Sequence, residues 1–280
     1  MRFSFVVSRW LGYPISGLFE TPESFAEFRN ALDLLKENGF DGVELNLHFS
    51  DDSLLTRIQN SIQESGLKLA AVGTGLLYAV EHLSFTDPES SRRARAVDVV
   101  KDLVRFASQS DAVVILGLLR GSCALTQDSV RRMLERCLVE CDSAAERCGG
   151  RLAIEAINRY ETQSLNNAAE VASMIDSLKL KATGILLDTF HMNIEEQSIE
   201  STLSKHISKL EHFHIADSNR WPPGDGHLDV GALLTQLNDL DYMGWASAET
   251  LPKPTRDDAV KHTAAYLKGL DMVRTKSKGL

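Results

Sequence analysis

Four side chains that are able to bind a metal ion follow one another at intervals of about one strand and one helix. They are Glu155, Asp188, His214 and Glu249, and the gaps between them are 33, 26 and 35 residues. Each follows a short apolar run that is typical of a buried strand. Burying several carboxylates together is costly unless the charges are paired or bind a cation, so the series favours a divalent metal ion. Three carboxylates and one imidazole suit Mn²⁺, with Mg²⁺ and Co²⁺ as alternatives.

Polar companions follow three of these positions, where loops contact a substrate in many enzymes. They are Asn158, Arg159, Glu161, His191, Asn219 and Arg220. Each also has an ordinary structural interpretation. The asparagines are able to cap loops, and the charged residues after Glu155 are able to form surface ion pairs. His191 stands between Phe190 and Met192, which also fits a packed core histidine. His227 lies in a loop rich in proline and glycine and has no predicted role.

The elements that must position these residues alternate between strand and helix eight times. The predicted strands are 3–8, 42–47, 67–73, 112–118, 151–156, 183–188, 210–216 and 244–249. The predicted helices are 23–38, 53–66, a helix within 88–109, 128–148, 167–178, 197–206, 229–240 and 256–274. Gly149 and Gly150 are a helix stop signal, and Asp229 is a suitable N-cap.

This alternation predicts an α/β fold, a single (β/α)8 TIM barrel domain over 1–280. The alternative is an open, doubly wound sheet, but its usual G-x-G-x-x-G signature after the first strand is missing. In a barrel of this kind the carboxyl ends of the strands converge on one mouth, where active sites lie. We therefore expect the four strand-end residues to meet there.

The composition excludes several classes of protein. The net charge of -9 argues against a nucleic-acid partner, because phosphate binding needs concentrated Lys and Arg. No window approaches 18 uninterrupted apolar residues, so we expect no membrane span, and Arg9 interrupts the short N-terminal apolar stretch. No C-x-x-C pair occurs among the four cysteines, so we expect buried or partly buried thiols and not a zinc cluster. Free thiols of this kind also favour a cytoplasmic location.

Three motifs carry a resemblance to a known family. They are "EAINRYE" (155–161), "LDTFHMNIEE" (187–196) and "HFHIADSNRWPPGDG" (212–226). The chain resembles the ketose 3-epimerase group of the sugar isomerase/epimerase superfamily, whose barrel is xylose isomerase-like. "GTGLLY" (73–78) and "GLLRG" (117–121) are closer to 5-keto-L-gluconate epimerase-like proteins. The family often has proline where this chain has Ala156 and Thr250, and these departures affect loop shape more than the ligands.

The resemblance implies a role for most of the candidate residues. It assigns Glu155, Asp188, His214 and Glu249 to one divalent metal, and it gives the two glutamates proton transfer as well. Glu161, His191 and Arg220 match its substrate-binding positions. The implied reaction inverts a carbon next to the carbonyl of a ketose or keto-sugar acid through a metal-stabilised enediolate. Members of the family are often homo-oligomers, either dimers or tetramers.

Some expectations rest on the residues alone. Arg120 follows the fourth strand and is a candidate ligand for a substrate carboxylate, with a surface ion pair as the alternative. Glu195 and Glu196 match the second motif, but we expect them to begin a helix, where acids suit the dipole.

Other functions on the same fold stay open. An aldose–ketose or hydroxypyruvate-type isomerase would use a similar site. The acidic charge and the single-metal ligand set argue against an apurinic endonuclease, and a sugar-binding protein would not need two opposed glutamates.

Overall fold

The computed structural model contains a closed barrel of eight parallel strands, and it describes residues 1–7, 19, 21–48 and 50–277. Each strand pairs with its neighbours in chain order, and β1 closes the barrel against β8. The strands are β1 (Arg2–Val6), β2 (Gly42–Asn46), β3 (Lys68–Gly73), β4 (Val113–Leu116), β5 (Arg151–Glu155), β6 (Thr183–Asp188), β7 (Leu210–Ile215) and β8 (Trp245–Ala248). The predicted TIM barrel is therefore confirmed.

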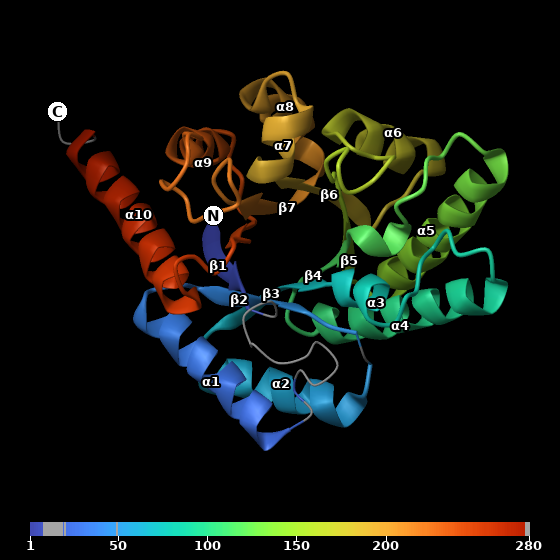
Figure 1. The fold of residues 1–280 in the computed structure, drawn as a ribbon, viewed down its shortest axis with the longest axis horizontal. Helices are drawn as coiled ribbons and strands as arrows, with labels where there is room; N and C mark the ends of the chain where they lie inside the picture. Colours follow the sequence, from blue (N-terminus) through green and yellow to red (C-terminus); the bar gives the residue numbers. More distant parts are fainter. Residues whose placement is uncertain (8–18, 20, 49, 278–280) are drawn as a thin grey trace.

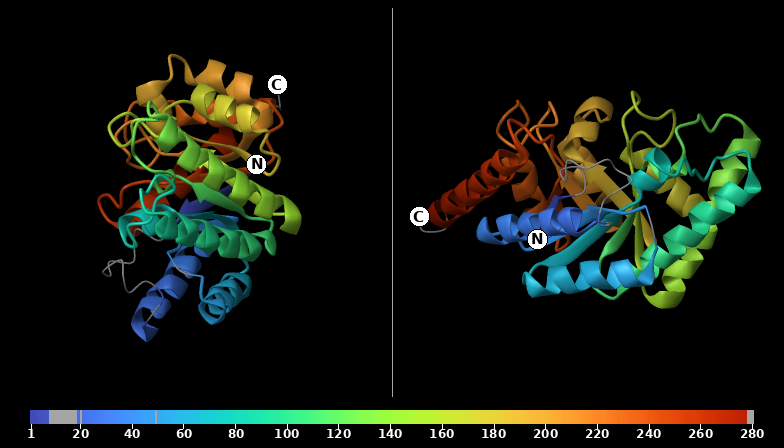
Figure 2. Two further views of the ribbon diagram at one scale, coloured as in Figure 1. Left: turned by 90° about the vertical axis from the view of Figure 1, so that its right-hand side faces the viewer. Right: turned by 60° about the horizontal axis from the view of Figure 1, so that its bottom comes forward.

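Helices cover the outside of this barrel (Figures 1 and 2). They are α1 (Pro22–Glu37), α2 (Asp52–Glu64), α3 (Gly75–Ala79), α4 (Ser90–Ser108), α5 (Asp128–Cys148), α6 (Ala168–Leu178), α7 (Thr189–Glu195), α8 (Ile199–His206), α9 (Val230–Asp239) and α10 (Arg256–Ser277). The C-terminus of α5 and the N-terminus of α9 have the caps that the sequence predicts. Gly149 caps α5 in the left-handed conformation at φ 66°, and the Asp229 carboxylate accepts from the Ala232 N–H at the start of α9.

The structure differs from the sequence prediction at the mouth. The short helices α3 and α7 were not predicted, and a 3-10 turn, Leu118–Arg120, follows β4. The prediction that Glu195 and Glu196 begin a helix is wrong, because Glu195 ends α7 and Glu196 is its C-cap. Both acids instead bind across the mouth loops: Glu195 pairs with Arg159, and Glu196 accepts from the Ala168 N–H. Residue 8 of the predicted first strand lies outside the described residues.

The two faces of each strand have different partners, as a closed parallel barrel requires. Residues such as Leu152, Ile154, Ile185 and Leu187 belong to the large apolar core shared with the helices. The alternate residues face the barrel interior. Part of that interior is a small apolar cluster of Ala71, Val113, Ile115, Ala153 and Leu186. The same inner faces carry the polar strand-end residues, so the apolar cluster lies below the site.

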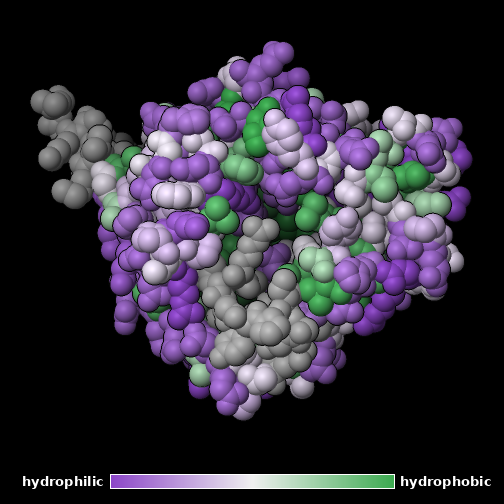
Figure 3. Space-filling view, viewed as in Figure 1, coloured by the Kyte–Doolittle hydropathy of each residue, from purple (hydrophilic) through white to green (hydrophobic). Residues whose placement is uncertain are grey.

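None of the described helices is both long and apolar enough to cross a bilayer. Viewed as in Figure 1, the molecule is hollowed near its middle, and both hydrophilic and hydrophobic side chains border the hollow (Figure 3).

Candidate metal centre and active site

The four predicted metal ligands lie together at the carboxyl ends of β5 to β8. Glu155, Asp188, His214 and Glu249 each offer one ligand atom, and these atoms all lie within 4.8 Å of one another. Glu155 and Asp188 are the last residues of β5 and β6, His214 is the fifth residue of β7, and Glu249 follows β8. Asp188 and His214 are partners in the β6–β7 register. The parallel register therefore sets these side chains at one level of the barrel.

Asp188 is held by the helix that begins immediately after it. It is the N-cap of α7, and its Oδ1 accepts from the Phe190 N–H at 2.8 Å. This bond leaves Oδ2 directed toward the site, 3.5 Å from His214 Nδ1. Since α7 starts without a linker, His191 lies in its first turn and returns toward the strand end. One carboxylate thus serves as both cap and candidate ligand.

His214 offers the strongest evidence that the group fits a cation. Its Nε2 hydrogen-bonds to Glu44 on β2 at 3.0 Å. Its Nδ1 is buried, has no hydrogen bond, and lies 3.1 Å from Glu249 Oε2. A buried nitrogen without a hydrogen bond, directed at carboxylate oxygens, is the arrangement that a metal ion satisfies. The donor set, with oxygens in the majority, fits a hard divalent cation.

Arg220 joins two of the carboxylates from the loop after β7. Its guanidinium donates to Asp188 Oδ2 at 2.5 Å and also to Glu249 Oε2. It lies 5.0 Å above the Phe190 ring, and its backbone has a φ of 63°. The side chain is nearly buried, so its charge is poorly screened. Arg220 therefore places a positive charge between the carboxylates of Asp188 and Glu249.

His191 and Glu161 are linked by an asparagine between them. Asn158 is buried, and its Nδ2 lies 2.7 Å from His191 Nδ1 and 3.1 Å from Glu161 Oε1. Its Oδ1 accepts from the Tyr160 N–H at 2.9 Å. His191 Nε2 is 3.6 Å from Glu155 Oε1, so the imidazole extends from α7 to one of the four candidate metal ligands. Asn158 is thus more than the loop cap that its sequence position suggested.

The surroundings of these groups shift their pKa values in different directions. Burial, and then the charge of Glu249, raises the pKa of Glu155 to about 8. Burial also disfavours ionisation of Asp188, but the charge of Arg220 and the contact with His214 outweigh it and lower that pKa. Burial lowers the pKa of His191, which favours its neutral form. In the cation-free protein, Glu155 therefore keeps a proton near neutral pH while Asp188 is ionised.

Arg120 is not brought into this group. It is almost fully buried behind β5, and its guanidinium donates to the carbonyls of Ser164 (2.8 Å), Glu155 (3.3 Å) and Leu165 (3.3 Å). The contact with a substrate carboxylate stays a prediction, and these bonds favour a structural role. Arg120 ties the turn after β4 to the loop that carries Asn158 and Glu161.

Two buried residues next to the site were not predicted. Glu44 on β2 and His212 on β7 face the barrel interior, and they hydrogen-bond at 2.8 Å. The sequence does hold a signal for both. Glu44 interrupts the apolar run "GVELNL", and His212 stands two residues before His214, so it shares the inner face. A charge inside a strand that is buried on both faces calls for a partner.

A glycine gives Glu155 its space. At Gly117, just after β4, a Cβ atom would lie 2.6 Å from Glu155 Oε2. Any side chain there would push the carboxylate toward the other ligands or force β4 to move. The close approach of this backbone explains why a residue without a side chain follows the fourth strand.

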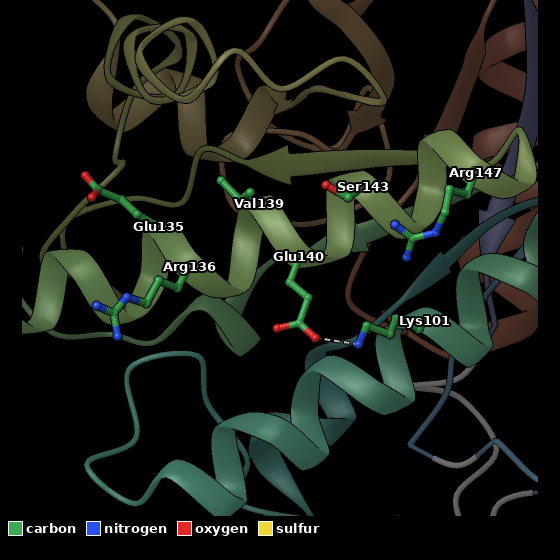
Figure 4. Close-up of a pocket in the computed structure, with 7 residues that line it drawn as sticks. All are labelled: Lys101, Glu135, Arg136, Val139, Glu140, Ser143 and Arg147. Carbon is green, nitrogen blue, oxygen red and sulfur yellow. Dashed lines mark hydrogen bonds and ion pairs between the residues drawn. The ribbon is translucent and has the colours of Figure 1, made fainter.

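A groove on the outside of the barrel is lined mostly by charged side chains. It lies between α4 and α5 and is lined by Lys101, Glu135, Arg136, Val139, Glu140, Ser143 and Arg147. Figure 4 shows Lys101 pointing toward Glu140, at 2.5 Å. The groove holds none of the predicted site residues, and its ion pairs are typical of a solvated surface.

The chain is similar to known proteins over most of its length. Residues 32–270 match the model of a family described as xylose isomerase-like TIM barrel. A D-psicose 3-epimerase of Enterocloster bolteae is 32% identical over 85% of this chain and 81% of that protein. A 3-dehydro-D-guloside 4-epimerase of Escherichia coli K12 is 28% identical over 77% of this chain and 84% of that protein. A solved L-ribulose 3-epimerase superposes with a TM-score of 0.80 at 22% identity, covering 99% of this chain and 97% of that one, which shows the shared fold.

Proposed function

Because the chain belongs to the xylose isomerase-like TIM barrel family, we propose that it is a carbohydrate epimerase that depends on a divalent metal ion. The relatives are named as ketose 3-epimerases and as a 4-epimerase of a 3-dehydro sugar. Both names describe inversion of a carbon next to a carbonyl group. The proposed reaction is therefore this inversion, on a ketose or a keto-sugar acid.

The observation that carries the proposal is the convergence of four ligand atoms within 4.8 Å, with a glutamate at each end of the set. Glu155 ends β5 and Glu249 follows β8, with two strands between them. Inversion through a planar intermediate needs an acid and a base on opposite faces of that plane. Two glutamates that reach the site from different sides of the mouth suit this requirement.

The residues divide the work as follows. One glutamate removes the proton from the carbon beside the carbonyl, and the other returns a proton to the opposite face. In this proposal, His191, Arg220 and Glu161 bind the oxygens next to that carbon. Asn158 orients His191 and Glu161 through its hydrogen bonds to both side chains. A divalent cation held by Glu155, Asp188, His214 and Glu249 would supply positive charge that stabilises the enediolate.

The elevated pKa of Glu155 fits a proton-transfer group. Its carboxyl releases a proton far less readily than an ordinary glutamate, because it is buried beside Glu249. Groups with pKa values near the working pH are the most effective general acids and bases. This raised pKa belongs to the cation-free protein, and the charge of a cation bound by Glu155 would lower it.

The cation, the location and the assembly stay predictions. Mn²⁺ is the predicted cation, with Mg²⁺ and Co²⁺ as alternatives. A cytoplasmic location and a homo-oligomeric state, dimer or tetramer, are proposed with it. The resemblance to 5-keto-L-gluconate epimerase-like proteins predicts a keto-sugar acid as the substrate, and this also stays a prediction.

Solvent exchange tests the proposed reaction directly. We would incubate the Mn²⁺-loaded protein in D₂O with a panel of ketoses and keto-sugar acids, and follow the carbon-bound protons by NMR. We expect deuterium at the carbon next to the carbonyl, together with the epimer. An aldose as the product would favour the isomerase alternative, and no exchange with any substrate would defeat the epimerase.

Matched variants test whether solvent exchange needs the two glutamates, which are both candidate metal ligands and proposed acid–base groups. Glu155→Gln and Glu249→Gln should each lower the exchange rate at least about 100-fold, the usual contribution of a general acid or base. Glu211→Gln is the control, because Glu211 lies near the opposite end of β7 and pairs with Arg151. Equal losses in all three variants would show that the effect is not specific to the site.

A further inference from the structure

Glu44 is a buried carboxylate that faces two imidazoles inside the barrel. It is the third residue of β2 and is 1% exposed. Its Oε2 lies 2.8 Å from His212 Nε2, and its two oxygens lie 3.0 and 3.1 Å from His214 Nε2. An ionised carboxylate only accepts hydrogen bonds, so both of these nitrogens carry protons. Glu44 therefore sets the protonation of two rings at once.

The consequence concerns the other nitrogen of His214. A neutral imidazole carries a single proton, so a proton on Nε2 leaves Nδ1 with its lone pair. That Nδ1 is the atom that makes no hydrogen bond and faces Glu249 at 3.1 Å and Asp188 at 3.5 Å. We propose that Glu44 is a positioning residue that fixes the tautomer and the ring orientation of His214, so that Nδ1 is presented to the cation. Histidine ligands of metals commonly donate their second N–H to a carboxylate.

His212 completes this arrangement as a support for Glu44. It is two residues before His214 on the same inner face of β7, one layer deeper in the barrel. The two rings pack edge to face, with centroids 5.2 Å apart. The bond from His212 fixes Oε2 of Glu44, and the carboxylate in turn fixes the ring plane of His214. The inference rests on the proposed function, because it concerns the ligand set proposed there.

The same three residues allow one rival interpretation. Glu44, His212 and His214 have ligand atoms close enough to hold a cation of their own. Two N–H···O hydrogen bonds account for the distances without one, because each N–H meets a carboxylate oxygen at ordinary length. The number of ions bound per chain separates the two interpretations.

Metal affinity is the readout that a merely structural role would not change. Glu44→Gln keeps the shape of the side chain, but its amide nitrogen cannot accept a hydrogen bond from an imidazole N–H. We expect Mn²⁺ affinity, measured by calorimetry on the whole protein, to fall about 10- to 100-fold, the usual cost of losing such a carboxylate. Asp142→Asn is the matched control. Asp142 is also a buried carboxylate, but it accepts from Thr183 and two backbone N–H groups at the far end of the barrel. Its variant should lose stability and keep its affinity.

A second measurement needs no variant. NMR of the Mg²⁺-loaded wild-type chain with ¹⁵N-labelled histidine should show His214 protonated at Nε2 and not at Nδ1. The opposite tautomer would overturn the inference, as would Mn²⁺ affinity in Glu44→Gln within about twofold of the wild type. Two ions per wild-type chain and one in the variant would establish the rival cation site instead. A wild-type chain that binds neither Mn²⁺ nor Mg²⁺ would overturn the proposed metal site and this inference together.

Discussion

Glu155 and Asp188 are buried carboxylates in one cluster, yet their surroundings push their pKa values in opposite directions. Burial and the charge of Glu249 disfavour ionisation of Glu155 and raise its pKa. Arg220 and His214 favour ionisation of Asp188 and lower its pKa. The two pKa values differ because Arg220 pairs with Asp188 at the end of β6 and with Glu249 after β8, and not with Glu155 at the end of β5. Residue type alone does not tell a proton donor from a fixed anion, whereas the neighbours of each carboxylate do.

Asn158 gives the sharpest test at the scale of one residue. Asn158→Ala removes the bonds to His191 Nδ1 and Glu161 Oε1, so both proposed substrate contacts lose their orientation. We expect kcat/KM to fall about 10- to 100-fold, in line with about 1–3 kcal/mol for buried hydrogen bonds. Mn²⁺ affinity should stay within about twofold, because the side-chain hydrogen bonds of Asn158 among the described residues go to His191, Glu161 and Tyr160 and not to a candidate metal ligand.

Asn219→Ala is the matched control for this variant. Asn219 holds a neighbouring mouth loop in the same way, by accepting from the Trp221 N–H and donating to the Asp225 carbonyl. It has no bond to His191. If both variants lose activity equally, general loop disorder explains the effect and the positioning role of Asn158 is wrong.

At the scale of elements, the turn after β4 and the loop after β5 form one unit held by Arg120. Its guanidinium donates to the carbonyls of Ser164, Leu165 and Glu155, and the side chain is almost fully buried. Buried carbonyls of a loop need such donors, because they have no strand or helix partner. This bonding keeps the loop that carries Glu161 closed against β5.

Arg120→Met should therefore destabilise the protein without changing its substrate preference. Arg120→Met removes a donor from three carbonyls, of which that of Ser164 keeps the Thr162 hydroxyl, and this is expected to lower the free energy of unfolding by about 2–4 kcal/mol. KM for a neutral ketose and KM for a keto-sugar acid should change by the same factor. Denaturant unfolding and steady-state kinetics on both substrates measure the two effects.

Arg151→Met serves as the comparison for Arg120. Arg151 forms half-exposed ion pairs with Asp111 and Glu211 at the other end of the barrel, so its loss should cost little. A selective rise in KM for the keto-sugar acid in Arg120→Met would restore Arg120 as a carboxylate ligand.

The sequence was most informative where a strand runs directly into the mouth. Asp188 and His214 were predictable, because each follows an apolar run and one strand–helix unit separates them. Helix α7 was missed since it has seven residues and starts at the strand end, which leaves no loop to mark it. The partners of Glu44 and Arg120 were not predictable either. Their contacts join residues more than 30 positions apart, and only the closed barrel brings them together.

At the scale of the whole molecule, the barrel holds a cluster of like charges that destabilises the cation-free state. The folded pKa of Glu155 is about 8, above its ordinary value of 4.5. A group of this kind contributes stability that is full below pH 4.5 and is lost as the pH rises through 8. His214 acts in the same direction, because its pKa is also raised. Glu44 has a pKa lowered to about 2, so its contribution is lost only in acid.

The metal-free protein should therefore become less stable between pH 5 and pH 8. One proton difference is worth about 1.4 kcal/mol per pH unit, so the melting temperature should fall measurably across this range. Glu155→Gln removes the ionising group, and its melting temperature should fall less steeply. Mn²⁺ should raise the melting temperature most at pH 8, because ligands bind the metal in their deprotonated forms. Thermal denaturation with a chelator, with Mn²⁺ and with Glu211→Gln as the control measures all three effects. A pH slope that is the same in Glu155→Gln and the wild type would show that the charge of Glu155 does not limit the stability of the folded barrel.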